Sequence, residues 1–588
     1  MKEHLEQLLR DALIALQAEE GLAIDLDMPI AFERTRDPLH GDFASNLAMV
    51  LAKPLGRKPR ELAERLVAHL SPSADVSKVE IAGPGFINFY LNKAAFQAVV
   101  ADVLTNTQYG HSNYGNAERI QIEFVSSNPT GPLHVGHGRS AAYGASLANL
   151  LTAVGYEVHK EYYVNDAGRQ MDILAVSVWL RYLQSFGDTF TFPSAGYQGD
   201  YIADIAAALK VEHGESLRRP IMSIYQDIAA DELPDVEGGD KEAHISALVK
   251  RTKELLGPEA YRTIFDKALH TILADIRDDL SAFDVEYDEW FSEQTLQTNG
   301  AVGRAINTLQ AAGHLYEQDG ATWFRSTTYG DDKDRVLIRS NGELTYFATD
   351  IANHFNKFER GFTKVINVLG ADHHGYVPRL KAAITALDID SKSLHIPLVQ
   401  FAILYRGDQR VQMSTRSGSF VTLRELREEV GKDAARFFYI MRKSEQHMDF
   451  DLELAKSQSN DNPVYYIQYA HARICSVFRQ LEEKKLTWDQ AQGLTALHLL
   501  TESHEQALLA DLVLYPEIVE TAALAYEPHQ LAHYLRTLAN DFHTYYNAHQ
   551  FLVTEDNLRN SRLCLITAVR QVLANGLQLI GVSAPQTM

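Results

Sequence analysis

The fold is decided by the stretch Ser126-Ser127-Asn128-Pro129-Thr130-Gly131-Pro132-Leu133-His134-Val135-Gly136-His137-Gly138-Arg139. The alternating run at residues 120–125 before it predicts a β-strand, and the alanine- and leucine-rich run at residues 140–151 after it predicts a helix. The stretch therefore joins the end of a strand to the N-terminus of a helix. In a parallel α/β sheet this junction commonly binds phosphate, because free backbone N–H groups and the helix dipole face the anion.

Two kinds of residue in this stretch suit a phosphate. His134 and His137 are three residues apart, so two neutral-to-cationic imidazoles can donate to the same triphosphate. Gly131, Gly136 and Gly138 have no Cβ to keep a phosphate away from the backbone. A His-x-x-His pair by itself more often marks a solvated helix face or a zinc site. Here the strand-to-helix setting and the Pro-Thr-Gly-Pro turn favour phosphate.

The composition limits the class of protein. A chain of 588 residues is too long for one hydrophobic core and predicts about three or four domains. The hydrophobic content of 46% and charged content of 22% are typical of a globular protein, and no apolar run is long enough for a bilayer. The N-terminal residues resemble neither a secretory signal nor a transit peptide. We therefore expect a cytoplasmic protein without a membrane partner.

Cysteine content and net charge add two further limits. Cys475 and Cys564 are the only cysteines, which excludes a disulfide framework and a cysteine-rich zinc site. The net charge of −22 argues against nucleic-acid binding over the whole surface, where a basic footprint is expected. A local basic groove on an acidic body stays compatible with it.

The order of patterns predicts a multidomain α/β protein. Residues 1–112 combine helical spacing with short strands and form an α+β domain. Residues 113–455 alternate strands and helices, which is typical of a doubly wound parallel sheet of the Rossmann type. Within them, residues 185–290 form a helical insertion to which we assign no chemical role. Residues 456–588 form an all-α helical bundle, entered at a proline-initiated helix at Pro463.

Polar residues also follow the second predicted strand, residues 157–164. Asn165 and Asp166 come directly after it, where the carboxyl ends of parallel strands face the ligand crevice. They are therefore candidates for the site. The alternative is that Asp166 is the N-cap of the next helix.

A third candidate cluster suits a cationic ligand. Tyr346 and Asp350 are four residues apart and share one face of a predicted helix. A carboxylate binds a guanidinium through paired N–H···O bonds, and an aromatic ring adds a cation–π interaction. The alternative is an ordinary helix-terminal acid beside a packing tyrosine.

Two more clusters follow predicted strands. Residues 364–369 lead into Gly370 and Asp372, and a carboxylate in that position commonly accepts from ribose hydroxyls. The adjacent His373 and His374 point in two directions, so we assign no zinc to them. A predicted strand at residues 395–404 leads into a polar loop with three arginines, which suits a mobile phosphate clamp but also an ordinary solvated loop.

The motifs resemble one family over the whole chain. His134-Val135-Gly136-His137 resembles the "HIGH" signature of class I aminoacyl-tRNA synthetases, and the longer strings at residues 127–139 and 162–170 resemble the arginyl-tRNA synthetases. The resemblance implies ATP-dependent activation of L-arginine, with Mg²⁺ accompanying ATP, and transfer to tRNA(Arg). It also implies that tRNA is needed before arginine is activated. We expect a monomer.

The resemblance also assigns residues to roles. It places His134, Gly136 and His137 on the phosphates and Gly370 and Asp372 at the ribose of ATP. The arginine-binding residues it implies are Glu123, Ser126, Asn128, His134, Tyr346 and Asp350.

The "KMSKS" loop of class I synthetases corresponds here to Gln412-Met413-Ser414-Thr415, which has neither signature lysine. Met413 and Ser414 remain as ATP-binding candidates. Arg410 and Arg416 are the catalytic candidates for the missing positive charge.

The flanking domains resemble tRNA-binding modules of the same family. The N-terminal domain matches, through Gly41-Asp42-Phe43 and Asn46, the extension that contacts the tRNA elbow. The C-terminal domain resembles the anticodon-binding domain, where Tyr465, Tyr469 and Arg473 are candidates to contact unpaired bases. The alternative for these aromatic residues is a core stripe.

Two other functions are alternatives to this interpretation. A cysteinyl-tRNA synthetase would share the helical C-terminal domain, but it would need thiolate zinc ligands that two scattered cysteines cannot supply. A catalytically weak tRNA-binding paralogue is the other alternative, suggested by the missing lysines.

Overall fold

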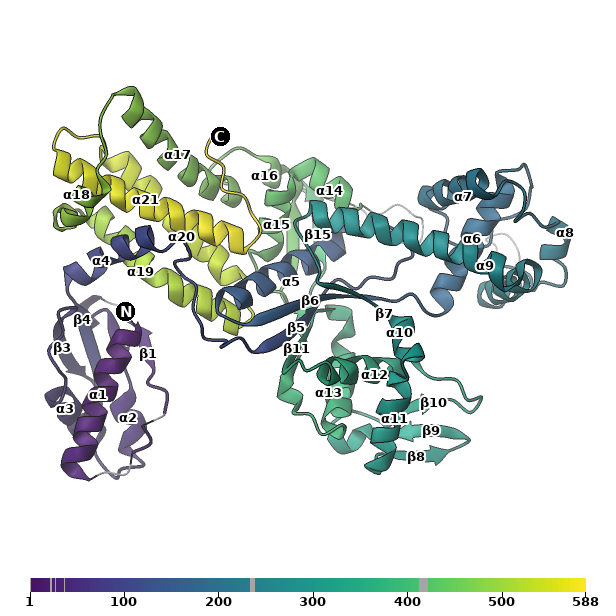
Figure 1. Ribbon diagram of the computed structural model, residues 1–588, viewed down its shortest axis with the longest axis horizontal. Helices are drawn as coiled ribbons and strands as arrows, with labels where there is room; N and C mark the ends of the chain where they lie inside the picture. The colour runs from purple at the N-terminus through teal and green to yellow at the C-terminus, as the bar shows by residue number, and fades with distance from the viewer. Residues whose placement is uncertain (1, 22–23, 27, 36–37, 233–237, 412–420) are drawn as a thin grey trace.

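The computed structural model describes residues 2–21, 24–26, 28–35, 38–232, 238–411 and 421–588 (Figure 1). Its centre is a parallel sheet of five strands, which are β5 (Arg119–Glu123), β6 (Glu157–Val164), β7 (Glu289–Ser292), β11 (Lys364–Asn367) and β13 (Leu394–His395). Their order in the sheet is β13-β11-β5-β6-β7. From β5, the chain first adds β6 and β7 on one side of the sheet and later adds β11 and β13 on the other side. This reversal is the topological switch point of a doubly wound sheet, where ligands bind.

Helices cover this sheet, and their packing follows from the sequence. The principal ones are α5 (Val135–Ala153), α6 (Arg169–Gln184), α12 (Tyr346–Glu359) and α13 (Val377–Ala386). Helix α5 is buried along most of its length, which its alanines and glycines allow. A Cβ on Gly144 would lie 2.3 Å from Cγ of Phe124, so the helix approaches the end of β5 closely because that residue is glycine.

Smaller sheets extend the central domain. One is antiparallel and contains β8 (Leu315–Gln318), β9 (Ala321–Phe324) and β10 (Arg335–Ile338). Two others contain β12 (Leu369–Gly370) with β14 (Leu398–Val399), and β15 (Ala402–Arg406) with β16 (Gln409–Arg410) and β17 (Met448–Asp451).

The single strand predicted at residues 395–404 is wrong, because the segment supplies β13, β14 and β15 to three different sheets. Pro397 lies between β13 and β14 and cannot donate to a ladder.

The remaining short helices of the domain lie around these sheets. They are α10 (Glu293–Thr298), α11 (Ala301–Ala311), α14 (Leu423–Val430), α15 (Lys432–Ile440) and α16 (Leu452–Lys456). Short 3-10 turns also occur, among them η3 (Ala371–Tyr376) directly after β12.

The predicted insertion is helical and projects to one end of the molecule (Figure 1). It contains α7 (Asp200–His213), α8 (Ile221–Ile224) and the long α9 (Lys241–Ala282). Helix α9 is interrupted at Gly257, whose φ of 74° is left-handed, and Pro258 follows it. Beyond this break α9 returns the chain to the central sheet at β7.

The N-terminal domain has its own antiparallel sheet in the order β1-β2-β4-β3 and its own hydrophobic core. Its elements are α1 (Lys2–Glu20), β1 (Phe32–Arg34), β2 (Phe43–Ser45), α2 (Leu47–Ala52), α3 (Pro59–Ala68), β3 (Val76–Ala82) and β4 (Phe86–Leu91). Helix α4 (Lys93–Thr105) then leaves this domain and packs on the C-terminal bundle, where Nε2 of Gln571 donates to the carbonyl of Val103 at 2.8 Å.

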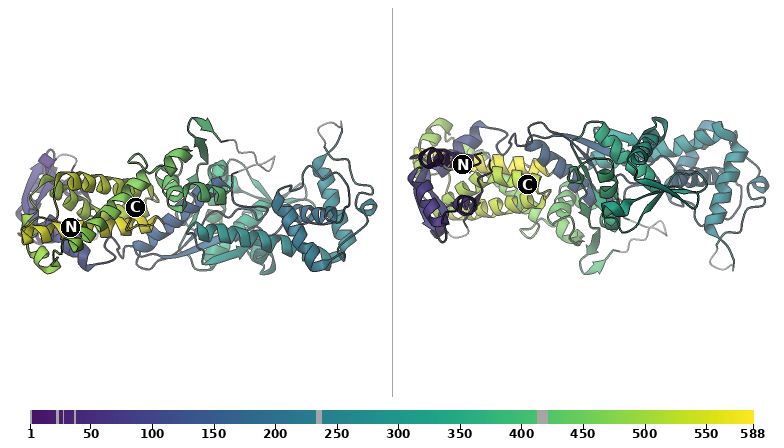
Figure 2. Two further views of the ribbon diagram at one scale, coloured as in Figure 1. Left: turned by 90° about the horizontal axis from the view of Figure 1, so that it is seen from above. Right: turned by 90° about the horizontal axis from the view of Figure 1, so that it is seen from below.

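The C-terminal bundle contains α17 (Pro463–Glu483), α18 (Gln490–Thr495), α19 (Ser503–Leu524), α20 (His529–Ala548) and α21 (Asp556–Leu579). As predicted, a proline opens its first helix. Figure 2 shows this bundle and the N-terminal domain at one end of the molecule and the helical insertion at the other.

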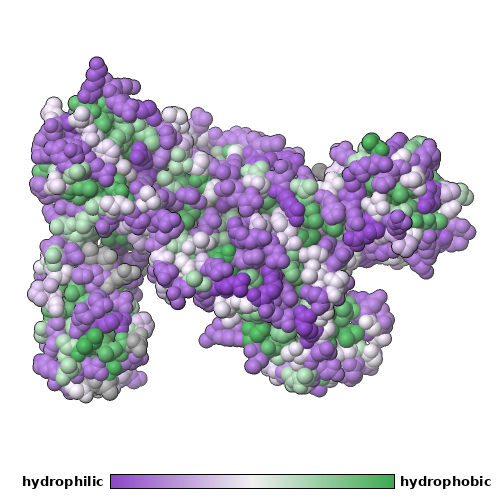
Figure 3. Space-filling view, in the orientation of Figure 1, coloured by the Kyte–Doolittle hydropathy of each residue, from purple (hydrophilic) through white to green (hydrophobic). Residues whose placement is uncertain are grey.

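The surface is mainly polar. On the face drawn in Figure 3, hydrophilic residues predominate and hydrophobic ones are scattered among them. Among the described residues, no helix has both the length and the apolar character that a membrane span requires.

Candidate active site

A cavity of about 1090 Å³ opens at the carboxyl ends of β5 and β11, at the switch point of the sheet. It brings together residues that are far apart in the sequence. The sequence-predicted residues in its wall are Glu123, Ser126, Asn128, Gly131, His134, Gly136, His137, Asn165, Tyr346, Asp350, Gly370 and Asp372.

The two histidines of the opening stretch form a stacked pair at the start of α5. Their ring centroids are 3.7 Å apart. Nδ1 of His134, the N-cap, accepts from the backbone N–H of Gly136 at 3.1 Å, and Nδ1 of His137 accepts from that of His134 at 3.2 Å. Each Nδ1 is therefore an acceptor, so each ring carries its proton on Nε2 and can donate it to a ligand.

Both rings are neutral at physiological pH. Burial lowers the pKa of His137 to about 3, with a smaller contribution from His134, and burial also lowers the pKa of His134. The sequence left open whether these imidazoles are neutral or cationic, and the structure favours neutral donors. Positive charge for a phosphate must then come from another part of the chain or from a metal ion bound to the nucleotide.

The glycines of this stretch do not all face the cavity. Gly131 and Gly136 line it, whereas Gly138 is buried inside the protein. A Cβ on Gly138 would lie 2.8 Å from Cδ1 of Leu423 and 2.8 Å from Cε2 of Tyr439. The expectation that Gly138 lets a phosphate approach the backbone was therefore wrong, because this glycine makes room for neighbouring side chains.

A strained turn links β5 to the opening stretch. Val125 and Ser126 have φ values of 68° and 41°, which residues with a side chain rarely adopt. Such a conformation costs about 1–3 kcal/mol for each residue. Its result is that Oγ of Ser126 accepts from the backbone N–H of Tyr163 at 3.0 Å, so the turn is fastened to the end of β6.

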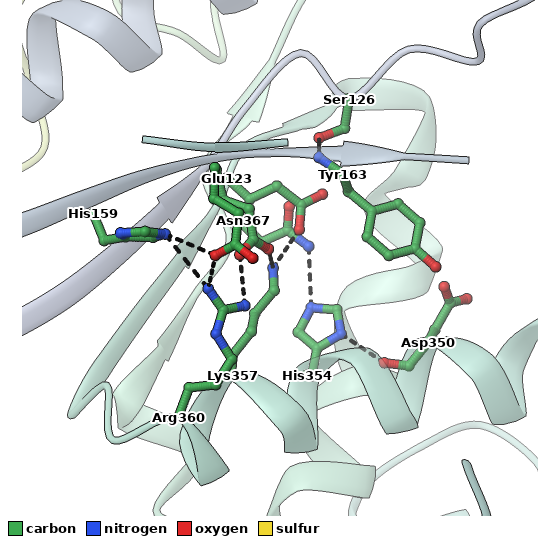
Figure 4. A network of polar contacts seen from close by, with 11 residues as sticks. Glu123, Ser126, His159, Tyr163, Asp350, His354, Lys357, Arg360 and Asn367 are labelled. Carbon is green, nitrogen blue, oxygen red and sulfur yellow. Dashed lines mark hydrogen bonds and ion pairs between the residues drawn. The ribbon is translucent and has the colours of Figure 1, made fainter. Parts of the chain in front are cut away.

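Carboxylates lie in and next to the cavity wall, because Asp350 lines it and the buried Glu293 lies next to the wall residue Asn165. Burial raises the pKa of Asp350 to about 6, although the hydroxyl of Tyr376 donates to its carboxylate and opposes the shift. Burial, the charge of Asp350 and that of Asp166 raise the pKa of Glu293 to about 7. Figure 4 shows the Tyr163 hydroxyl pointing toward Asp350. This group of carboxylates has the charge and hydrogen-bonding capacity to receive a cation.

Sequence patterns gave no sign of Glu293, which lies at the start of α10. With its amide turned so that the nitrogen faces Glu293, the orientation that satisfies both amide atoms, the cavity residue Asn165 donates to Oε2 of Glu293 at 2.5 Å. The suggested N-cap role of Asp166 was wrong, because Gly168 is the N-cap of α6. The buried Asp166 instead accepts from Oγ of Ser292 at 2.6 Å and so fixes the start of α10.

Tyr346 and Asp350 lie one helical turn apart on α12, as their spacing predicts. Tyr346 is the first residue of the helix and is 67% exposed, so its ring stands at the mouth of the cavity. Asp350 lies deeper in the wall. The side chain of Thr345 caps the helix by accepting from the backbone N–H of Ala348, which sets where the helix begins.

Glu123, the last residue of β5, already has a partner. Its buried carboxylate forms an ion pair with Lys357, and it also hydrogen-bonds Ser126. Burial acts to raise the pKa of Glu123, but the ammonium of Lys357 outweighs it and holds the pKa below its usual value. Nothing in the sequence pointed to Lys357, since a lysine near a helix C-terminus is common.

The predicted ribose residues lie beyond β11. Gly370 ends β12, and Asp372 lies in η3 with its side chain 58% exposed. Nε2 of His373 is 3.6 Å from the Asp372 carboxylate, while His373 itself also lines the cavity.

The loop that aligns with the second class I signature is described only in part. Arg410 is an exposed residue of the hairpin strand β16 and is not in the cavity wall. Met413, Ser414 and Arg416 lie outside the described residues.

The helical insertion contributes to the cavity, which sequence patterns did not indicate. Several residues between Ser194 and Tyr201 line it. The hydroxyl of Tyr201 donates to the carbonyl of Thr130 at 2.8 Å, and it fastens the turn that precedes His134 to the insertion.

One group in the described part of the chain has the spacing of metal ligands. It contains His159, Glu161 and Glu289. The guanidinium of Arg360 donates to Glu161 at 2.6 Å and to Glu289 at 2.5 Å. This arginine already supplies the positive charge that a metal would bring.

The predicted tRNA-contacting residues lie on the outer domains. Tyr465 and Tyr469 stack on α17 with centroids 5.9 Å apart, and the guanidinium of Arg473 lies 4.6 Å from the Tyr469 ring. All three side chains are partly exposed, so they form a ladder rather than a buried stripe. Asn46 is half-buried directly before α2.

Family models cover nearly the whole chain. The model of the arginyl tRNA synthetase N terminal domain matches residues 3–91, and that of the DALR anticodon binding domain matches residues 467–588. The model "tRNA synthetases class I (R), catalytic domain" matches residues 99–191 and 202–471. The domains therefore occur in the predicted order.

Full-length relatives agree with these models. The chain is 61% identical over 589 residues to the arginine–tRNA ligase of Thioalkalivibrio sulfidiphilus and 56% identical over 589 residues to that of Legionella pneumophila. Each match covers 100% of both chains. The arginyl-tRNA synthetase of Thermus thermophilus shares the fold, with a TM-score of 0.73 at 24% identity over 99% of this chain and 100% of that one.

These matches favour an enzyme over the alternative of a catalytically weak paralogue. The catalytic-domain model covers the two signature regions and the cavity wall apart from residues 194–201, and the full-length relatives are arginine–tRNA ligases. The protein uses ATP, and its substrates include L-arginine and tRNA(Arg). The chain belongs to the arginyl-tRNA synthetases, the class I aminoacyl-tRNA synthetases that ligate arginine to its tRNA.

Proposed function

We propose that the cavity holds ATP at its histidine end and L-arginine at its acidic end, and that the two substrates react where these ends meet. The observation that supports this division is the contrast between the histidines and the carboxylates. The cavity wall contains neutral Nε2–H donors at a helix N-terminus and, from α12, the raised-pKa carboxylate of Asp350. The raised-pKa carboxylate of Glu293 lies next to the wall residue Asn165. A phosphate suits the donors and a guanidinium the carboxylates.

In the proposed pocket, Asp350 and Glu293 receive the guanidinium, and the exposed ring of Tyr346 covers it. Glu123 accepts from the α-ammonium group of arginine, and Asn128 and Ser126 complete this side. Asn128 and Ser126 line the cavity close to Glu123 in the sequence and after the same strand. The α-carboxylate then lies toward the histidines.

The proposed chemistry has two steps. An oxygen of the arginine carboxylate attacks the α-phosphorus of ATP, and the bond to the bridging oxygen of pyrophosphate breaks. The terminal hydroxyl of tRNA next attacks the carbonyl of arginyl-adenylate, and AMP leaves. The protein positions the groups, and His134 and His137 donate to the phosphate oxygens where charge develops.

The remaining nucleotide contacts are also proposals. Gly136 lets the phosphates approach the start of α5, and Gly370 and Asp372 lie at the ribose. Met413 and Ser414 contact ATP, and Arg410 and Arg416 provide the positive charge that the absent lysines would supply. Mg²⁺ enters with ATP, which fits the oxygen donors of the cavity wall, and no zinc is required.

For tRNA, we propose contacts at Asn46 in the N-terminal domain and at Tyr465, Tyr469 and Arg473 on α17. Partly exposed stacked rings next to an arginine suit unpaired bases. The proposed domain boundaries are 1–112, 113–455 and 456–588. We propose a monomer that acts in the cytoplasm.

The activity is tested by ATP–pyrophosphate exchange. We expect exchange only when arginine and tRNA(Arg) are both present, because the resemblance to the family implies that tRNA is needed before arginine is activated. Citrulline has the shape of arginine without the positive charge and serves as the control substrate. Exchange with citrulline at the rate seen with arginine would contradict a carboxylate-lined guanidinium pocket.

The pH dependence of arginine binding follows from the raised pKa values. In the free enzyme, Asp350 is protonated below about pH 6 and Glu293 below about pH 7. A bound guanidinium favours the ionised carboxylates, so arginine binding releases protons in this window and tightens as the pH rises through it. The KM for arginine should therefore fall by about tenfold between pH 5.5 and pH 7.5 and then level off.

Calorimetry measures the released protons directly. At pH 6.5, the heat of arginine binding in two buffers with different ionisation enthalpies should differ, and the sign of the difference should correspond to proton release. Glu293→Gln should reduce the number of protons released. Equal heats in both buffers would show that these carboxylates are already ionised before arginine binds.

A further inference from the structure

A row of polar side chains crosses the central sheet below the cavity. In register, Asn367 on β11 pairs with Glu123 on β5, Glu123 with Glu161 on β6, and Glu161 with Glu289 on β7. One polar residue on each of four neighbouring strands therefore occupies the same level of the sheet. Three of the four are glutamates.

Three residues of α12 and its C-cap, spaced three apart, contact the polar residues of this row (Figure 4). Nε2 of His354 accepts from Nδ2 of Asn367 at 3.0 Å. Lys357 pairs with Glu123, and Arg360 with Glu161 and Glu289. Three helical residues rise about 4.5 Å, close to the spacing of about 4.8 Å between strands, so each step along the helix reaches the next strand.

Lys357 is the central member of this arrangement. Its side chain is fully buried, and its ammonium lies between Glu123 and Glu161, with Oε1 of Glu161 at 3.8 Å. Among the described residues, that oxygen of Glu161 has no hydrogen-bond partner. Without Lys357, Glu123 would be a buried carboxylate with no neutralising charge, a state that burial strongly disfavours.

The same helix carries the proposed guanidinium ligand. Asp350 lies seven residues before Lys357, on the same face of α12. Nδ1–H of His354, between them, donates to the carbonyl of Asp350 at 2.8 Å. Several charged or polar groups surround Glu123. Helix α12 contributes Lys357, His354 and Asp350, and strand β6 contributes Glu161 and Tyr163. The others are Ser126 after β5, Asn367 of β11, and Tyr287.

We propose that Lys357 is a positioning residue of the arginine pocket, which holds the Glu123 carboxylate as an anion facing the cavity and so builds the subsite for the α-ammonium group of the substrate. The inference rests on the arginine-binding role proposed above for Glu123. Lys357 acts through Glu123 and does not touch the substrate. Arg360 supports Lys357 because it forms ion pairs with Glu161 and Glu289. The ammonium of Lys357 can therefore pair mainly with Glu123.

The first test is Lys357→Gln. We expect the KM for arginine to rise by about tenfold or more at pH 7.5, with the KM for ATP within about twofold of the native enzyme. The ratio of variant to native arginine KM should grow as the pH falls to 6.5, because Glu123 without the ammonium binds a proton more readily. Lys357→Arg keeps the charge and should restore most of the affinity.

Lys364→Gln is the matched control. Lys364 is the first residue of β11 and, like Lys357, pairs with a glutamate, Glu118, at 3.3 Å, but both residues are partly exposed and outside the cavity. This variant should leave both KM values unchanged. If Lys357→Gln raised the KM values of arginine and ATP equally, with no dependence on pH, Lys357 would serve only the fold and the inference would be wrong.

A second comparison applies even where Lys357→Gln alone does not fold. In the single variant Glu123→Gln, Lys357 still has its ion pair with Glu161. In the double variant Glu123→Gln/Lys357→Gln, Glu161 still has its ion pair with Arg360. Neither variant therefore leaves a buried charge without a partner of opposite charge. If Lys357 acts through Glu123, both variants should show the same arginine KM within about twofold. A further tenfold rise in the double variant would overturn the inference.

The two proposals fail in different ways. An unchanged arginine KM in Glu123→Gln would remove Glu123 from the arginine pocket. A raised arginine KM in Glu123→Gln together with native behaviour in Lys357→Gln would keep the pocket and remove the role of Lys357.

Discussion

The variant His134→Asn is expected to lower the rate of arginyl-adenylate formation by about 10²- to 10³-fold, which is typical for the loss of one donor to a developing negative charge. His134 caps α5 through Nδ1, and its Nε2–H is the proposed donor to the phosphate. Asparagine places an oxygen near the position of Nδ1 and is itself a favourable N-cap. The substitution therefore removes the donor and keeps the cap.

Pre-steady-state formation of arginyl-adenylate, with saturating ATP, arginine and tRNA(Arg), measures this effect. The melting temperature should change little, and the KM for arginine should stay within about threefold of the native value. His134→Gln, which can return an N–H near the position of Nε2, should recover part of the rate. A native rate in His134→Asn would show that this ring does not contact the reacting phosphate.

The second large effect is expected for Asp350→Asn, whose KM for arginine should rise by about 10²- to 10³-fold. Removing one partner of a buried, hydrogen-bonded charge pair costs about 2–5 kcal/mol. The asparagine keeps the size of the side chain and can still accept from the Tyr376 hydroxyl, so the pocket keeps its shape. The charge that would hold the guanidinium is lost.

Aminoacylation kinetics at varied arginine and at varied ATP separate the two substrates. The KM for ATP should change by less than about threefold, because the phosphate end of the cavity is untouched. Glu359→Gln is a suitable control, since Glu359 ends the same helix and pairs with Arg304 near the surface at 3.0 Å. An unchanged arginine KM in Asp350→Asn would place the guanidinium elsewhere.

Much of the architecture could be predicted because it follows from short-range patterns. The strand at residues 157–164 appears with the predicted bounds, and a helix begins at Pro463 as predicted. The alternation of strands and helices predicted the doubly wound sheet, and residues after its strands meet at one edge. Segment 395–404 differs, because its pairing depends on three separate sheets and not on its own pattern.

The parts of the site that were missed depend on three-dimensional proximity. Glu293, Lys357 and Tyr201 are chemically ordinary residues in the sequence and reach the site only through the packing of α10, α12 and the helical insertion. The charge state of the histidines was likewise inaccessible, because burial sets it. The strained turn at Val125 has no sequence signature, since valine is not a residue that normally adopts a positive φ.

The matching of α12 to the strands also limits how this region can change length in evolution or in engineered chimeras. One inserted residue between Asp350 and Arg360 would turn the remainder of the helix by about 100° and move it by about 1.5 Å. Lys357 would then leave Glu123, and Arg360 would leave Glu161 and Glu289. Insertions and deletions within α12 are therefore not tolerated, so exchanges between relatives belong before Tyr346 or after Arg360.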